Sequence, residues 1–259
     1  MLGRHVPLLL YADDIVLLAS SEVELQAMLD LVSSYARRWR FHTNHKKSNV
    51  VVMGTRAQKL RCAAFTWELA GRRLIVLEEY KYLGAESGKA SGAAGRWNSL
   101  LGLSALMYQC GGSDGLRPRT AIAHWKNSVR PVCEYACELW EGEISATWVT
   151  KLETIQYSVG KAALGLHANP AAVGVRAELG LEEMRFRRQE LKLRWWGRLC
   201  AVPQERLLSL LFRRRHAEVL SGGAKFSGLR SLQKLLVSYG FAEEWLGRRA
   251  GPKRSGIVL

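Results

Sequence analysis

The stretch VPLLLYADDIVLLA at residues 6–19 places two acidic residues between two apolar runs. Strand-like runs separated by a few small or acidic residues are typical of a β-hairpin. The pattern therefore predicts that Asp13 and Asp14 lie at a tight turn held by hydrophobic strands. Adjacent carboxylates at a rigid turn suit a hard cation such as Mg²⁺, which takes oxygen ligands. An ordinary surface turn, in which Asp supplies local hydrogen bonds, is the alternative interpretation.

The residues that follow predict a helix packed on short strands. Ser21 and Glu24 have the spacing of a capping box. An apolar stripe at helical spacing then runs through Leu25, Leu29, Val32, Ala36 and Trp39. We interpret the arginines at positions 37, 38 and 40 as cations that offset the helix dipole. Strands are predicted at 49–53, 65–69 and 74–77, the last two as arms of one hairpin.

A shift in composition at residues 86–95, which are rich in Gly, Ser and Ala, marks the best candidate boundary. Beyond it apolar residues recur at helical spacing, and the most basic helix is predicted at 182–200. The predicted fold class is α+β: a partial antiparallel sheet with a packed helix, followed by an all-α region. We expect domains at residues 1–90, 91–166 and 167–259.

The charge of the chain favours a polyanionic partner. Residues 151–259 carry 20 Lys and Arg against 9 Asp and Glu, which gives +11 of the net +15. Nucleic acid is the partner that this balance favours, and a solvated basic surface is the alternative. Phosphate contacts are predicted for one face of the most basic helix, formed by Arg185, Arg188, Lys192 and Arg198.

The five cysteines are odd in number and scattered, which argues against a disulfide framework and for a reducing compartment. Cys133 and Cys137 share a predicted helix face. A zinc site would need two more ligands, and no nearby Cys/His pair supplies them, so buried thiols are the preferred interpretation. No apolar stretch reaches the roughly 20 residues that span a bilayer. We therefore expect a soluble, intracellular protein with no membrane partner.

The order of motifs along the chain resembles the reverse transcriptase of non-LTR (LINE-like) retrotransposons. Tyr11-Ala12-Asp13-Asp14 matches the catalytic box of that family. The further similar segments, in the family's order, are Trp39 with Phe41, Asn44-His45-Lys46-Lys47-Ser48 and the apolar run 49–54, Tyr80-Lys81-Tyr82-Leu83-Gly84, the segment VRPVCEYACELW at 129–140, and Glu178-Leu179-Gly180-Leu181.

The resemblance implies RNA-templated DNA synthesis by two-metal nucleotidyl transfer, with Mg²⁺ as cofactor and an RNA template and DNA primer as partners. It implies a nuclear protein or a cytoplasmic ribonucleoprotein. Asp13 and Asp14 would ligate metal, and Tyr11 and Lys47 would lie near the incoming nucleotide. Tyr82, Leu83 and Gly84 would form the primer grip. In the terms of this family, residues 1–90 correspond to a partial palm, and a thumb-like helical region follows.

The chain also departs from the family's pattern. The polymerase uses a further aspartate on an earlier palm strand, about a hundred residues upstream of the paired acids, and ten residues precede Tyr11 here. From the sequence we expect a C-terminal fragment of such an enzyme, inactive by itself. The alternatives are a non-catalytic nucleic-acid-binding helical protein derived from such an element, and a helical interaction module in which the acidic pair is only a turn.

Overall fold

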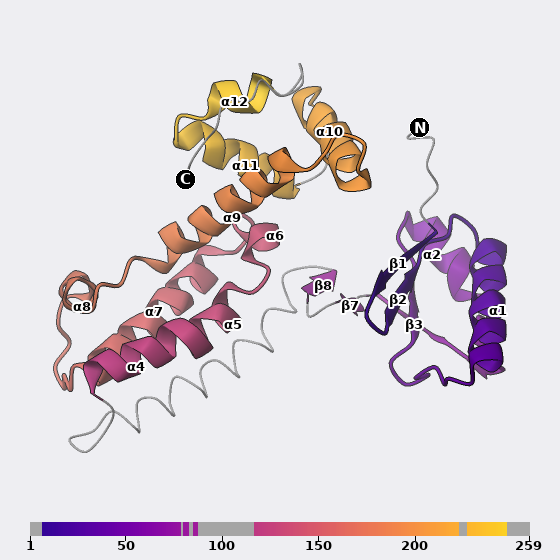
Figure 1. The fold of residues 1–259 in the computed structure, drawn as a ribbon, viewed down its shortest axis with the longest axis horizontal. Coiled ribbons are helices and arrows are strands. Elements are labelled where there is room, and N and C mark those ends of the chain that lie inside the picture. Colours follow the sequence, from indigo (N-terminus) through magenta and orange to yellow (C-terminus); the bar gives the residue numbers. More distant parts are fainter. Residues whose placement is uncertain (1–6, 79, 83–84, 88–116, 223–226, 248–259) are drawn as a thin grey trace. The chain divides into compact units, whose positions relative to one another are not determined.

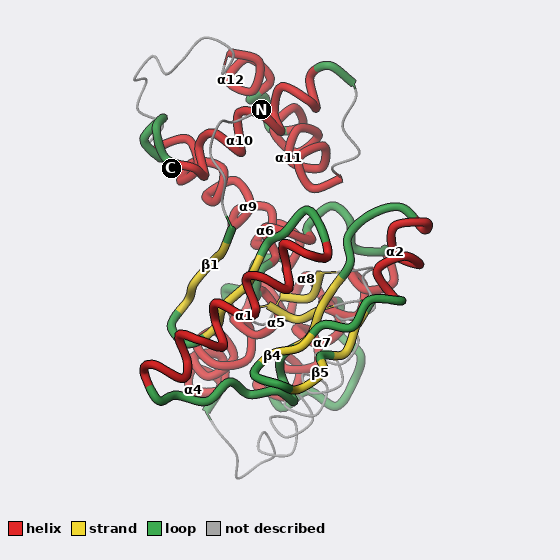
Figure 2. The backbone as a smooth tube through the Cα atoms, turned by 90° about the vertical axis from the view of Figure 1, so that its right-hand side faces the viewer, coloured by secondary structure: helices red, strands yellow, loops and turns green. Residues whose placement is uncertain are grey.

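A computed structural model describes residues 7–78, 80–82, 85–87, 117–222 and 227–247 (Figure 1). The chain divides into two compact units, Met1–Gly92 and Ala93–Leu259. Helices dominate, and the strands of the described residues all belong to the first unit (Figure 2). The predicted α+β class is therefore confirmed. None of the described helices is long and apolar enough to cross a membrane.

The elements of the first unit are, in chain order, β1 (Leu8–Tyr11), β2 (Asp14–Leu17), α1 (Glu22–Trp39), β3 (Asn49–Val51), α2 (Arg56–Ala63), β4 (Glu68–Leu69), β5 (Arg72–Arg73), β6 (Ile75–Leu77), β7 (Tyr80–Tyr82) and β8 (Ala85–Ser87). The described elements of the second unit are α4 (Pro118–His124), the π-helix η2 (Trp125–Val129), α5 (Arg130–Glu134), α6 (Cys137–Trp140), α7 (Ala146–Ala163), α8 (Ala172–Leu179), α9 (Met184–Ala201), α10 (Leu207–Leu220), α11 (Ser227–Ser238) and α12 (Ala242–Gly247).

The helix α1 begins where the sequence predicts. The hydroxyl of Ser21, its N-cap, accepts a hydrogen bond from the N–H of Glu24 at 3.2 Å. The carboxylate of Glu24 accepts from the N–H of Ser20 at 2.8 Å. In a standard capping box this second bond would come from the N-cap residue itself, so the motif is present with one arm shifted by one residue.

The core of the first unit forms where α1 packs on the strands that follow it. Its buried members are Leu29, Val50, Trp67, Leu69 and Leu74. Hydrogen bonds fix the register of the helix on β4. The Gln26 amide donates to the carbonyl of Glu68 and accepts from the Glu68 N–H, both at 3.0 Å. The hydroxyl of Ser33 accepts from the N–H of Ala70 at 2.9 Å.

The strand pairing differs from the predicted hairpin of 65–69 with 74–77. The segment ends in β4, which pairs with the two-residue β5 across a turn at Ala70 and Gly71, both with positive φ (51° and 75°). The chain then crosses to place β6 parallel to β3, with Val50 opposite Val76. Two residues of β5 complete the hairpin, which frees the apolar run of β6 to pair elsewhere.

Two further features of the first unit were not expected from the pattern. The helix α2 follows Gly54 and begins at a capping box formed by Thr55 and Gln58. Trp39, predicted on the buried stripe of α1, is 61% exposed. The buried stripe ends at Ala36, because the chain leaves the core at the end of the helix.

In the second unit, α4, η2 and α5 form one continuous rod with a wide turn in its middle. The wide turn directly precedes Pro131, which lacks an N–H and would clash with the carbonyl four residues earlier in a regular α-helix. The π-helix at Trp125–Val129 accommodates the proline without ending the rod. Trp125 and Val129 are buried by this arrangement.

The helix α9 belongs to both hydrophobic cores of the second unit. Met184, at its start, is buried with Trp125 and Leu152 in the core that α4, η2 and α7 share. Trp196, near its end, is buried with Leu232 and Trp245 in the core of α10, α11 and α12. The prediction of a helix at 182–200 is therefore confirmed.

Two glycines of this unit give a matched test of close packing. Gly142 (φ 87°) and Gly180 (φ 57°) both have positive φ. A Cβ added at Gly142 would lie 2.6 Å from the Cβ of Ser231, whereas a Cβ added at Gly180 would meet nothing within 4 Å. We expect Gly180→Ala to lower the free energy of unfolding by about 1–2 kcal/mol from backbone strain alone. Gly142→Ala should cost about 2–5 kcal/mol, because overpacking adds to the strain. Urea denaturation of both variants measures the difference, and equal losses would contradict the close approach.

Candidate functional site

The paired acids occupy the turn of the β1–β2 hairpin. Tyr11 pairs with Asp14, which leaves Ala12 and Asp13 as a two-residue loop. Two-residue loops require positive φ at their first or both central positions, which favours glycine. Ala12 has φ 52° here without being glycine, so the turn stores backbone strain next to the acids.

The hairpin presents its turn to solvent. Asp13 and Asp14 are exposed, and the ring of Tyr11 is 63% exposed. A hydrogen bond from the N–H of Leu18 to the carbonyl of Pro7, at 2.7 Å, closes the open end of the hairpin. Leu17 packs against the core of the first unit. The predicted arrangement, two carboxylates on a strand-held turn, is thus present.

The turn offers oxygen ligands but not a complete metal cluster. Carboxylates are the ligands that Mg²⁺ prefers, so the chemistry of Asp13 and Asp14 fits this ion. Among the described residues, no group of three or more His, Cys, Asp or Glu side chains lies close enough to hold a metal ion. The described residues thus offer two carboxylates at this turn, fewer than a two-metal centre needs.

The other residues predicted for the palm are only partly described. Lys47 is exposed and lies in the turn that leads into β3, where its N–H donates to the carbonyl of Asn44 at 3.0 Å. Tyr82 ends the strand β7. Leu83 and Gly84 lie outside the described residues.

The prediction of phosphate contacts for Arg188 and Lys192 is corrected by their burial. Both point into the second unit and are at most 1% exposed. The Arg188 Nε donates to Glu141 at 2.7 Å. The Lys192 ammonium donates to the Glu141 carbonyl at 2.5 Å and to the Ser231 hydroxyl at 2.6 Å. Burial lowers the pKa of Lys192, although the nearby carboxylates of Glu143 and Glu141 oppose the shift.

The outer arginines of α9 remain accessible. Arg185 is 52% exposed, lies 3.4 Å from a Glu183 carboxylate oxygen and stacks over the ring of Phe186 at 4.6 Å. Arg198 is 66% exposed and lies 3.5 Å from a carboxylate oxygen of Glu138. Such exposed ion pairs add little to the stability of the fold, and their partners are easily replaced. Both guanidinium groups therefore stay available to a phosphate.

Cys133 and Cys137 are buried thiols, as the sequence predicts. Cys133 and Cys137 are both free and at most 2% exposed. Burial raises the pKa of each thiol to about 12, and neighbouring glutamates add to the rise. They are therefore neutral core residues at neutral pH.

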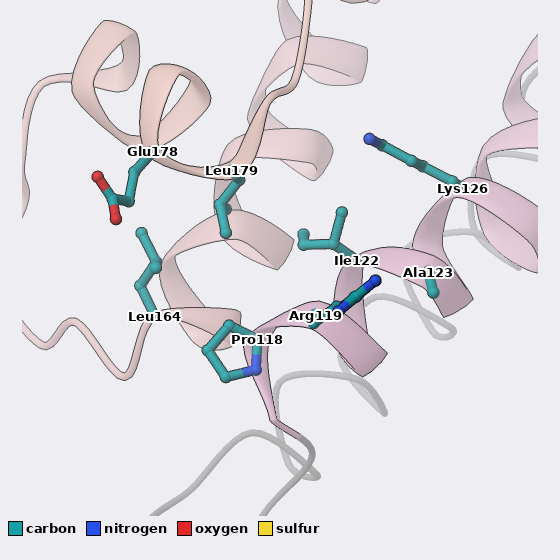
Figure 3. Close-up of a pocket in the computed structure, with 8 residues that line it drawn as sticks. All are labelled: Pro118, Arg119, Ile122, Ala123, Lys126, Leu164, Glu178 and Leu179. Atoms are coloured by element: carbon teal, nitrogen blue, oxygen red, sulfur yellow. The ribbon is translucent and has the colours of Figure 1, made fainter.

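A shallow pocket lies where α4 meets the ends of α7 and α8 (Figure 3). Its lining includes the apolar side chains of Ile122, Leu164 and Leu179 and the charged side chains of Arg119, Lys126 and Glu178. The Lys126 ammonium donates to the carbonyl of Gly180 at 3.3 Å. None of the residues predicted to carry chemistry lines this pocket.

Sequence patterns did not identify two residues that make important contacts in the structure, Glu141 and Tyr35. Glu141, the buried partner of Arg188, gives no local signal, because its role depends on a contact 47 residues away. Tyr35 lies four residues before Trp39 and its ring contacts those of Trp39 and Phe41. The spacing of these three aromatics is visible in the sequence and would have indicated a ring cluster.

Comparison with known families gives one match. Residues 2–87 match the family described as reverse transcriptase (RNA-dependent DNA polymerase). The match contains the hairpin, α1 and the strands through β8, and residues 88–259 lie outside it. Comparison with curated proteins and with solved structures gives no match.

The buried pair of α9 should be far more important for stability than the exposed pairs of the same helix. Glu141→Gln leaves the Arg188 charge buried without a counter-ion, so we expect a loss of about 3–5 kcal/mol in the free energy of unfolding. Glu190→Gln is the control, because Glu190 pairs with Arg194 and Arg187, neither of which is fully buried, and it should cost less than about 1 kcal/mol. Similar urea midpoints for the two variants would show that Arg188 is hydrated.

The raised thiol pKa values predict selective alkylation. At pH 8 in the native protein, iodoacetamide should leave Cys133 and Cys137 unmodified, because only the thiolate reacts and both thiols are buried. The partly exposed Cys62 and Cys200 are internal references. All four should react in urea. Peptide mass mapping reads the result, and native modification of Cys133 at the rate of Cys200 would contradict the burial.

Proposed function

We propose that the first unit forms part of the palm of an RNA-directed DNA polymerase of the non-LTR retrotransposon type, with Asp13 and Asp14 as metal ligands. The observation that carries this proposal is the Tyr11-Ala12-Asp13-Asp14 hairpin, whose two acids are exposed at a strand-held turn within the segment that matches the reverse transcriptase family.

In this proposal each residue of the turn has a distinct task. Asp13 ligates Mg²⁺ directly, and Asp14, at the start of β2, ligates or supports it. Mg²⁺ bound there would activate the primer hydroxyl and stabilise the leaving pyrophosphate. The exposed ring of Tyr11 lies beside the incoming nucleotide or the template-primer. Lys47 contributes a cation near the triphosphate.

The helical unit then supplies contacts to the nucleic-acid backbone. After the burial of Arg188 and Lys192, the candidates from the sequence are Arg185 and Arg198. Such contacts hold the backbone by charge and are independent of base sequence. A non-catalytic nucleic-acid-binding protein, derived from a polymerase, would keep these contacts and the fold while lacking the chemistry.

Metal binding at the turn can be tested directly on the chain. We expect Mn²⁺, used as a paramagnetic substitute for Mg²⁺, to broaden the amide NMR signals of Ala12, Asp13 and Asp14 selectively. The double variant Asp13→Asn/Asp14→Asn should lose this broadening, because its amide side chains carry no charge. Asp30→Asn is the matched control, since Asp30 is an exposed acid on α1. Broadening that survives the double substitution would refute the metal role.

A nucleotide-incorporation assay distinguishes a catalytic polymerase from a protein that only binds nucleic acid. Two adjacent acids do not hold two metal ions in productive geometry by themselves. We therefore expect the 259-residue chain to bind template-primer without extending it. Template-dependent extension that Asp13→Asn abolishes would overturn the expected inactivity and establish the chain as a polymerase.

A further inference from the structure

Three aromatic rings form an exposed cluster at the C-terminal end of α1. The ring centroids of Tyr35 and Trp39 are 6.0 Å apart, and those of Tyr35 and Phe41 are 5.9 Å apart. Tyr35 is 58%, Trp39 61% and Phe41 39% exposed. Large aromatic side chains gain most when buried, so three rings that contact one another in solvent indicate a surface available to a ligand.

The backbone at the end of the helix builds this cluster. Tyr35 and Trp39 lie four residues apart on one face, beside the face that buries Leu29 and Ala36. Arg40 follows in the left-handed conformation, with φ 56°. The chain therefore turns back, the N–H of Phe41 bonds to the carbonyl of Ala36 at 3.1 Å, and the Phe41 ring contacts Tyr35.

The residue in the left-handed position is informative. Glycine is the usual residue there, because in any other residue the Cβ lies too close to the following carbonyl oxygen. An arginine at this point keeps a cation next to the rings at a cost in backbone strain. Strain at an exposed position is the kind of feature that marks a functional surface.

The segment that carries the rings is basic. Residues 31–48 contain no Asp or Glu. The five cations in this segment are all exposed: Arg37, Arg38, Arg40, Lys46 and Lys47. Arg37 donates to the hydroxyl of Ser34 at 3.4 Å, and no ion pair joins any of the five to a described acid. The helix dipole accounts for cations in the last turn but not for the lysines beyond it.

We propose that Tyr35, Trp39 and Phe41, with the five cations of the same segment, form a platform that binds single-stranded nucleic acid. Unpaired bases stack on aromatic rings irrespective of sequence, while the phosphates of the same strand pair with arginine and lysine. A duplex hides the base faces in its own stack and offers only the phosphates. The combination of exposed rings and cations therefore favours a single strand over a duplex.

The rings of this platform are separate from the proposed catalytic turn, and Lys47 is the one residue that both proposals use. The platform uses α1 and the segment after it, and none of its rings belongs to the hairpin that carries Asp13 and Asp14. Loss of metal binding at the turn would leave the platform intact. Conversely, a protein that never polymerised would still use the platform to hold a strand.

The test is binding by the full chain, measured by fluorescence anisotropy with a labelled oligouridylate and with a duplex RNA of equal length. The double variant Tyr35→Ala/Trp39→Ala should bind the single strand at least about tenfold more weakly, since stacking on each ring is lost. Binding to the duplex should change less than about twofold. Trp39→Phe should retain most of the affinity, because a ring remains.

Matched variants separate stacking from folding and from charge. Leu31→Ala removes an apolar side chain from α1 that is 71% exposed and one turn away, and should leave both affinities unchanged. Arg185→Ala/Arg198→Ala should weaken single-strand and duplex binding equally. Circular dichroism melting checks that each variant is folded. A further readout is photo-crosslinking of 4-thiouridine oligomers, which should label the peptide that contains Tyr35 and Trp39.

Two outcomes would overturn the proposal. One is unchanged single-strand affinity in the folded double variant, with no crosslink to the α1 peptide. The other is a wild-type dimer in sedimentation that the double variant converts to monomer while strand affinity stays the same. That second result would assign the ring cluster to a contact between copies of the chain.

Discussion

The second unit depends on the burial of two cations of one helix. Arg188 and Lys192 lie one turn apart on α9 and both reach Glu141, Arg188 its carboxylate and Lys192 its backbone carbonyl. This one residue therefore offsets part of the cost of removing the two charges from water. Because Lys192 also reaches Ser231, this contact joins the segment after α6 to α9 and α11. The contact therefore links α9, which belongs to both hydrophobic cores, to α11, which belongs to one of them. The most basic helix of the chain thus uses part of its charge for structure and only part for its surface.

The first unit shows the opposite distribution. Two acids, the strained Ala12 and several apolar side chains lie at the surface of one small hairpin, where Leu10, Tyr11 and Ile15 are each more than 40% exposed. A two-stranded hairpin is marginal by itself, and this one reaches the core mainly through Leu17. Its surface properties are therefore those of an element adapted to contact another molecule or segment, not those of a finished exterior.

Local patterns predicted local structure well and long-range contacts poorly. The hairpin around Asp13, the start of α1 at Ser21 and the helix at 182–200 follow from spacing and capping, which act over a few residues. The parallel pairing of β3 with β6 does not, because the pattern of Ile75-Val76-Leu77 is equally consistent with either partner. The burial of Arg188 depends on Glu141, 47 residues away, so helical spacing alone placed it wrongly beside Arg185. The role of the hairpin acids in chemistry stays a prediction, since it depends on a metal ion rather than on the fold.

The parallel pair β3–β6 has a consequence for the order in which the first unit folds. Asn49 and Ile75 must meet across a connection that contains α2, β4 and β5. Closing such a loop costs chain entropy before any contact of the pair forms, whereas α1 and the β1–β2 hairpin need only neighbours in sequence. We therefore expect the local contacts of the helix and the hairpin to precede the pairing of the sheet that completes the core. A nascent chain would consequently expose the acidic turn and the aromatic end of α1 before the unit has a stable interior.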